Sequence, residues 1–249
     1  MKILIGTPVY DDQVFVPYYL SMLRLLNDFS RQGVAFDTAL PTSSFIINAR
    51  NALATQVLED KSYSHLLFID YDMGFQPSLI AKMIAIDQPV TAAIYPKRAV
   101  DYTRLVKVVR ERPDETRFRE VAQDYVIRPH LKDGGLEVRG DFIRALHAGT
   151  GIMLIRRDAL ETLRERFPEL WAESDPTGTY GPMGITGGVF QPFNQYRDDH
   201  GVYLTEDYSF SRRWQDCGGD IWACYNETIT HVGRERFVGN YEHRLQARI

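Results

Sequence analysis

Two carboxylates stand two positions apart at the end of an apolar stretch. Asp70 and Asp72 follow residues 65–69, whose sequence HLLFI predicts a buried strand. Successive strand residues point to opposite faces, so both acids reach one face only if the chain already turns at Tyr71. Their hard oxygen atoms suit Mg²⁺ or Mn²⁺, which proteins usually share with the phosphates of a substrate. The alternative is a strand that ends in an ordinary acidic turn.

The segments that must position these acids alternate between strand and helix patterns. Buried strands are expected at 2–6, 34–40, 65–69 and 90–95, and amphipathic helices at about 17–31, 45–59 and 77–86. Ser43 or Ser44 is expected to cap the second helix. Short strand–helix units of this kind predict an α/β fold with a mostly parallel central sheet covered by helices on both faces. Such sheets bind ligands beyond the carboxyl ends of their strands, where Asp70 and Asp72 are expected.

The pattern changes in the second part of the chain. Residues 99–145 are expected to form a small insert, with 103–111 and 116–127 as strands of an antiparallel flap and a turn at Gly134-Gly135. Regular elements return as a strand at 152–155, helices at 158–166 and 206–217, and a strand at 221–224. Residues 168–201 are irregular and rich in proline and aromatic side chains, which is typical of a binding loop or lid. Residues 1–249 show no repeat or linker, and we expect one domain.

The overall composition excludes several classes of protein. A net charge of −4 argues against a nucleic-acid binder that relies on a broad basic surface. No apolar run approaches the ~20 residues of a membrane span, and the N-terminus does not read as a signal peptide. The two cysteines, Cys217 and Cys224, fit packing residues in a reducing compartment. We therefore expect a cytoplasmic protein.

Several short motifs occur in a fixed order along the chain. They are TPVY at 7–10, ARN at 49–51, FIDYDMGF at 68–75, AIYPKR at 93–98, GTG at 149–151, Glu206-Asp207 and His231. In this order they resemble the GT-A glycosyltransferases, and most of all the family-2-like enzymes that build bacterial or viral surface glycans. The resemblance covers nearly the whole chain. The Gln-x-x-Arg-Trp motif of processive synthases is missing at Arg213-Trp214, which puts a processive polymerase in doubt.

The resemblance implies a nucleotide-sugar transferase that uses Mn²⁺ or Mg²⁺. Breaking the bond to the sugar leaves a diphosphate whose growing negative charge must be neutralised. Asp72 is then expected to bind the metal, and Asp70 to support it through water or to hold the ribose. His231 is expected to reach the same ion, although an ordinary core or surface histidine is the alternative. The chain has no Cys/His cluster with the spacing of a structural zinc site.

The same resemblance assigns the residues that hold the nucleotide. Thr7, Pro8, Val9 and Tyr10 follow the first strand and are expected to line the base pocket, with Tyr10 beside a uracil-like ring. The donor is accordingly expected to be a UDP-sugar.

Other motif residues are expected to contact the donor phosphates or sugar. Arg50 lies on the inner half of a helix and must pair with a nucleotide phosphate or an internal carboxylate. Lys97, with Arg98 beside it, could meet phosphate or acceptor, or be an ordinary solvated residue. The Gly149-Thr150-Gly151 segment reads as a close backbone approach beside the donor sugar, or as a simple turn.

Glu206 and Asp207 open a helix after Thr205. Inverting transfer needs a carboxylate opposite the leaving diphosphate, and we expect Asp207 to be this catalytic base. Glu206 would orient the hydroxyl of a glycan or other acceptor, or cap the helix. The alternative is that both acids only complement the helix dipole. In a retaining enzyme, Asp207 would have another role.

Two other functional classes remain open. An Asp-x-Asp after an apolar strand also opens haloacid-dehalogenase phosphatases, but there it normally lies on the first strand, with Thr or Val where this chain has Gly74. A non-catalytic nucleotide- or glycan-binding module is the second alternative. The aromatic side chains between 168 and 203 would suit sugar stacking with or without catalysis.

Overall fold

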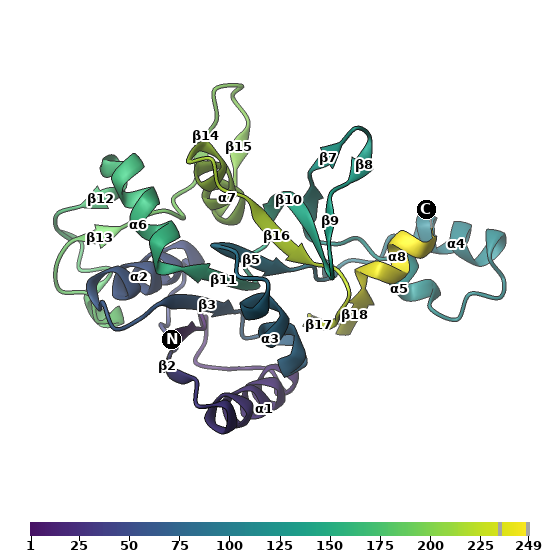
Figure 1. Ribbon diagram of the computed structural model, residues 1–249, viewed down its shortest axis with the longest axis horizontal. Helices are drawn as coiled ribbons and strands as arrows, with labels where there is room; N and C mark the ends of the chain where they lie inside the picture. Colours follow the sequence, from purple (N-terminus) through teal and green to yellow (C-terminus); the bar gives the residue numbers. More distant parts are fainter. Residues whose placement is uncertain (234–235, 248–249) are drawn as a thin grey trace.

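The computed structural model describes residues 1–233 and 236–247, which fold around one large sheet (Figure 1). Its strands are β1 (Lys2–Gly6), β2 (Ala35–Ala39), β3 (His65–Ile69), β5 (Val90–Ala93), β6 (Ile127–Pro129), β9 (Val138–Arg139), β10 (Phe142–Ala148), β11 (Ile152–Arg156) and β16 (Ile221–Cys224). They are arranged in the order β2-β1-β3-β11-β5-β16-β10-β6, and β9 also pairs with β10.

Most strands at the centre of this sheet run in one direction. β1 is parallel to β2 and β3, and β5 is parallel to β16. β11 lies antiparallel between β3 and β5, so these two strands also share a direction. The carboxyl ends of β1, β3 and β5 therefore lie at the same edge of the sheet, where α/β folds bind ligands.

Eight helices accompany the sheet in the described residues. They are α1 (Val16–Gln32), α2 (Ile46–Glu59), α3 (Pro77–Ala85), α4 (Tyr102–Glu111), α5 (Phe118–Ala122), α6 (Arg157–Arg166), α7 (Glu206–Asp216) and α8 (Tyr241–Ala247). In β3, Leu66 and Phe68 pack into the cluster that contains α2, α6 and α7, whereas Leu67 and Ile69 pack into the cluster with α1 and α3. Both faces of β3 are thus covered, which explains its unbroken apolar sequence. The predicted α/β class is confirmed.

Smaller antiparallel sheets surround this core. One contains β4 (Met73–Gly74), β17 (Thr228–Val232) and β18 (Arg236–Asn240). The other pairs are β7 (Leu131–Lys132) with β8 (Gly135–Leu136), β12 (Trp171–Ala172) with β13 (Val189–Phe190), and β14 (Tyr196–Arg197) with β15 (Tyr203–Leu204). Short 3₁₀ turns occupy Pro168–Leu170 and Gly181–Met183.

The insert differs from the flap of strands expected at 103–111 and 116–127. These segments contain the helices α4 and α5, and the prediction was wrong because frequent β-branched residues masked a helical period. The Asp101 side chain caps α4 by accepting a hydrogen bond from the Arg104 N–H at 2.9 Å. The turn expected at Gly134 is confirmed, since it joins β7 to β8 with positive φ at Asp133 and Gly134.

The irregular segment 168–201 packs against the body of the protein. Phe193 stacks on Phe210 with ring centroids 4.8 Å apart, and it meets the edge of Phe68 at 5.3 Å. Its backbone N–H donates to the Asn51 side chain on α2. Three of the aromatic side chains considered for sugar stacking, Tyr180, Phe190 and Phe193, therefore belong to buried clusters that cover α2.

The described helices include none that is both long enough and apolar enough to cross a membrane.

The helical form of α4 gives a test that a strand would fail. Val108 is 0% exposed and Val106 is 48% exposed, whereas in a strand these residues would share one face. We expect Val108→Ala to lower the free energy of unfolding by about 2 kcal/mol. The matched change Val106→Ala should cost less than about 0.5 kcal/mol. Urea denaturation measures both, and equal losses would contradict the helix.

Candidate active site

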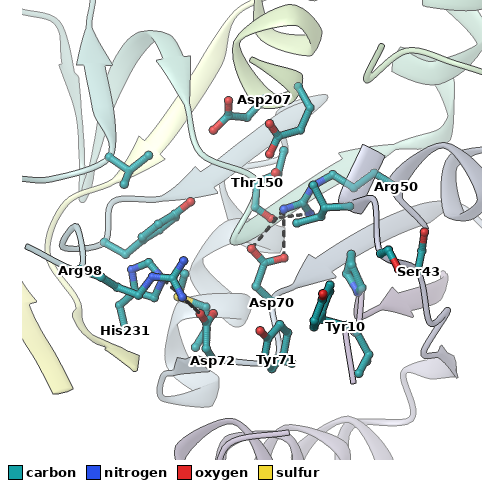
Figure 2. Close-up of a pocket in the computed structure, with 18 residues that line it drawn as sticks. Tyr10, Ser43, Arg50, Asp70, Tyr71, Asp72, Arg98, Thr150, Asp207 and His231 are labelled. Carbon is teal, nitrogen blue, oxygen red and sulfur yellow. Dashed lines mark hydrogen bonds and ion pairs between the residues drawn. The ribbon is translucent and has the colours of Figure 1, made fainter. Parts of the chain in front are cut away.

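A cavity of about 450 Å³ lies at the edge of the sheet where β1, β3 and β5 end (Figure 2). It brings together residues from distant parts of the sequence. The lining residues are 8–10, 43, 44, 46, 50, 70–73, 95, 98, 126, 150, 206, 207 and 231.

The deepest charge in this cavity is Arg50 on α2, whose side chain is only 2% exposed. Its Nη2 atom lies 3.1 Å from both carboxylate oxygens of Asp70, and its Nη1 donates to the Thr150 carbonyl at 3.4 Å. The internal carboxylate, one of the two partners expected for Arg50, is therefore present. Burial raises the pKa of Asp70, although the Arg50 guanidinium acts in the opposite direction.

Asp72 points to a different group of side chains. The chain turns after β3, where the Met73 N–H donates to the Asp70 carbonyl at 3.0 Å, and both acids line the same cavity. Asp72 Oδ2 lies 3.0 Å from Arg98 Nη1 and 3.5 Å from His231 Nε2. The two carboxylates thus share a cavity and have separate cationic partners.

His231 is held in one orientation by the backbone. β17 pairs with β4 so that His231 lies opposite Met73, and the Val232 N–H donates to the Asp72 carbonyl at 2.9 Å. The ring nitrogen Nδ1 is 2.8 Å from the Pro96 carbonyl oxygen, which can only accept. Nδ1 must therefore carry the proton, and a neutral His231 presents the lone pair of Nε2 toward Asp72.

These atoms fit part of a divalent-cation site. One carboxylate oxygen and one imidazole nitrogen are suitable ligands for Mn²⁺, and the Nδ1 contact orients the ring as in many metal sites. The described residues contain no group of three or more His, Cys, Asp or Glu side chains that could hold an ion. Phosphate or water oxygens would have to complete the coordination of a metal bound by Asp72 and His231.

A second acidic pair opens α7. Thr205 occupies the N-cap position of this helix without a side-chain capping bond. Its hydroxyl donates to Asp207 Oδ1 at 2.6 Å, and the Tyr208 N–H donates to the same oxygen at 2.8 Å. Burial, followed by the charge of Asp207, raises the pKa of Glu206. In Figure 2, Asp207 and Asp72 lie toward opposite ends of the group, with Asp70 between them.

Some of the predicted site residues do not line the cavity. The Thr7 side chain is buried and lies 2.8 Å from the Tyr18 hydroxyl. Lys97 is exposed, with its ammonium 4.0 Å from Asp124, and its neighbour Arg98 enters the cavity instead. Tyr71 and the segment Pro8–Val9–Tyr10 do line it, and Tyr10 is exposed at the rim.

Gly149 and Gly151 do not line the cavity themselves but pack against Tyr95, which does. A Cβ atom on Gly149 would lie 2.0 Å from the Tyr95 hydroxyl oxygen, and one on Gly151 would lie 2.8 Å from Tyr95 Cζ. The Gly151 N–H also donates to that hydroxyl at 3.2 Å. The close approach expected at these glycines therefore accommodates the Tyr95 ring, which lines the cavity beside Thr150.

Sequence reasoning missed other parts of the wall. Tyr95 belongs to the AIYPKR motif, which was its only signal, whereas Arg98 was named there beside Lys97 as a contact for phosphate or acceptor. Ser43 or Ser44 was expected to cap α2, but both line the cavity, and Phe45 occupies the N-cap position without a side-chain bond. Ile46, Met73 and Val126 carry no chemical signal of their own.

Comparisons with known proteins give only distant similarities. No protein-family model and no curated protein matches the sequence. The structure is similar to A197 from STIV, with a TM-score of 0.49 and 14% identity over 97% of this chain and 91% of that chain. It is also similar to Drosophila beta1,4-galactosyltransferase 7 in complex with manganese, UDP-Gal and xylobiose, with a TM-score of 0.47 and 14% identity over 95% and 74% of the two chains. A glycosyltransferase involved in the glycosylation of the major capsid of PBCV-1 has a TM-score of 0.34, with 13% identity over 68% of each chain.

The Arg50–Asp70 pair should dominate the stability of this region. Asp70→Asn keeps the shape of the side chain but leaves the buried Arg50 without its counterion, which typically costs about 3–5 kcal/mol. Glu59→Gln is the matched control, because it removes a carboxylate from an exposed pair with Arg164 at 3.6 Å and should cost less than about 1 kcal/mol. Urea unfolding compares the two variants, and similar small losses would show that Arg50 does not depend on Asp70.

Proposed function

We propose that this chain is a metal-dependent GT-A glycosyltransferase that moves a sugar from a UDP-sugar to a hydroxyl group of a glycan or other acceptor. One observation carries the proposal. A single cavity has Asp72 and His231 together at one end and a carboxylate, Asp207, toward its other end. A donor bound between them would have its diphosphate at the first end and its anomeric carbon facing the second.

The donor end would neutralise the diphosphate. Asp72 and His231 would hold Mn²⁺ or Mg²⁺, which when bound supplies positive charge to the leaving diphosphate. Pro8, Val9 and Tyr10 line the same cavity and would receive the base. Asp70 would act mainly by fixing Arg50, since both of its oxygens already face that guanidinium.

The acceptor end would remove a proton. Asp207 Oδ1 accepts hydrogen bonds from the Thr205 hydroxyl and the Tyr208 N–H, which fix the carboxylate at the N-terminus of α7. Asp207 would then take the proton of the acceptor hydroxyl as its oxygen attacks the anomeric carbon, with inversion. Glu206, which is half-buried beside it, would orient that hydroxyl.

The other functional classes have weaker support. A haloacid-dehalogenase mechanism would use Asp70 as the nucleophile, but Arg50 Nη2 lies 3.1 Å from both of its oxygens. A non-catalytic nucleotide- or glycan-binding module would use the same donor end and would differ in turnover alone.

The metal assignment is tested by nucleotide binding. Asp72→Asn keeps the size of the side chain but removes a charged ligand, so the Mn²⁺-dependent part of the affinity for UDP should disappear. His231→Ala should weaken this part less, because Asp72 and the phosphates still hold the ion. Calorimetry with UDP, with and without Mn²⁺, measures both effects. The control Asp87→Asn removes an exposed carboxylate paired with Arg156. If Asp72→Asn retains wild-type Mn²⁺-dependent affinity, the assignment is wrong.

The base assignment is tested by separating turnover from binding. Asp207→Asn can still accept the hydrogen bonds from Thr205 and Tyr208 but cannot take a proton. Transfer to an acceptor should fall by ~10²-fold or more, while the affinity for the donor stays nearly unchanged.

The matched variant for this test is Glu206→Gln, which removes the neighbouring charge. If Asp207→Asn transfers sugar within a few-fold of wild type, Asp207 is not the base. A larger loss in Glu206→Gln would then make Glu206 the base, and a small loss in both would favour a retaining mechanism.

A further inference from the structure

The Arg98 guanidinium lies beside the position proposed for the metal. Its Nη1 atom lies 3.0 Å from Asp72 Oδ2, the same oxygen that is 3.5 Å from His231 Nε2. The Asp72 side chain is 6% exposed and that of Arg98 is 52% exposed, so the guanidinium reaches inward from the open side of the cavity. Figure 2 shows Arg98 beside His231, directed toward Asp72.

The aliphatic stem of Arg98 packs against the backbone next to this position. A Cβ atom on Gly233 would lie 3.0 Å from Arg98 Cδ and 3.4 Å from Cβ and Cγ, so the stem packs closely on the Gly233 backbone. The aliphatic stem of Arg98 is therefore packed, whereas the guanidinium at its end is the more exposed part and can turn toward solvent.

A divalent ion held by Asp72 and His231 would compete directly with this guanidinium. Both cations would use the same Asp72 oxygen, and two positive charges a few ångströms apart repel each other strongly in a partly buried site. A diphosphate changes this balance, because its oxygens can accept the paired N–H groups of a guanidinium.

We propose that Arg98 competes with the metal for Asp72. Its guanidinium pairs with Asp72 until a nucleoside diphosphate binds, and it then moves onto the phosphates of that nucleotide. This inference rests on the proposed function and adds a condition for metal binding: the ion binds tightly only together with the nucleotide. By linkage, UDP raises the affinity for Mn²⁺ by the same factor by which Mn²⁺ raises the affinity for UDP.

The test removes the competing charge and measures metal binding without turnover. In Arg98→Met the stem remains and the guanidinium is lost, so Mn²⁺ alone should bind about tenfold more tightly or better than to wild type. The coupling factor between Mn²⁺ and UDP should fall accordingly. Arg98→Lys keeps a positive charge and should leave Mn²⁺ alone weakly bound. Calorimetry, or the loss of the free Mn²⁺ spin-resonance signal, gives these affinities.

The matched control is Arg156→Met. Arg156 ends β11 opposite His65, at the far edge of the sheet from the cavity, and it pairs with Asp87 at 3.3 Å. This variant loses an arginine–carboxylate pair of similar kind and should bind Mn²⁺ and UDP like wild type. If Arg98→Met does not fold, Arg98→Gln removes the same charge with a shorter side chain and replaces it in the comparison.

The outcomes separate this inference from the proposed function. If wild type and Arg98→Met both bind Mn²⁺ with UDP but have equal affinities for Mn²⁺ alone, Arg98 is not a competitor and the proposed function stands. If neither binds Mn²⁺ even with UDP, both the metal site and the role of Arg98 are wrong. Tighter binding of Mn²⁺ alone by Arg98→Met, and not by Arg156→Met or Arg98→Lys, is the result that supports the inference.

Discussion

Arg50 carries a charge that the fold cannot remove by deprotonation, because a guanidinium stays protonated in proteins. Its side chain lies on α2 against the sheet, so a carboxylate and carbonyl groups must surround it. Asp70 supplies the charge, and the Thr150 carbonyl supplies a further acceptor. The Asp70 N–H in turn donates to the Gly151 carbonyl at 2.8 Å. One buried cation thereby joins α2, the end of β3 and the turn before β11, which are three walls of the cavity.

This constraint divides the work between the two acids of the Asp-x-Asp motif. Asp70 pairs with the buried Arg50, whereas Asp72 faces the half-exposed Arg98 and the imidazole of His231. Glu206 lies near the same guanidinium. The positive charge of Arg50 lowers the pKa of Glu206, whereas burial and the charge of Asp207 raise it. The cavity therefore holds its acids in unlike surroundings, so that they can take different roles in one reaction.

The sequence predicted the sheet and its covering helices well because unbroken apolar runs such as 65–69 are typical of strands buried on both faces. It predicted residues from distant motifs at one cavity because strand ends in such sheets meet at one edge. It could not separate Arg98 from Lys97, since the direction of each side chain depends on contacts with distant residues such as Asp72 and Asp124. It also misread α4, where Val106, Val108 and Val109 imitate strand composition although the packing follows a helical period.

The position of His231 in the chain has a consequence for folding during synthesis. β17, which carries His231, lies on the β4 turn and pairs with β18, and α8 after it packs against α5 of the insert. The other residues that line the cavity all precede residue 208. A nascent chain can therefore build the strands up to β16, the Arg50–Asp70 pair and the N-terminus of α7 before His231 joins Asp72. At that stage Asp72 would have Arg98 as a partner but not the imidazole, which arrives with β17.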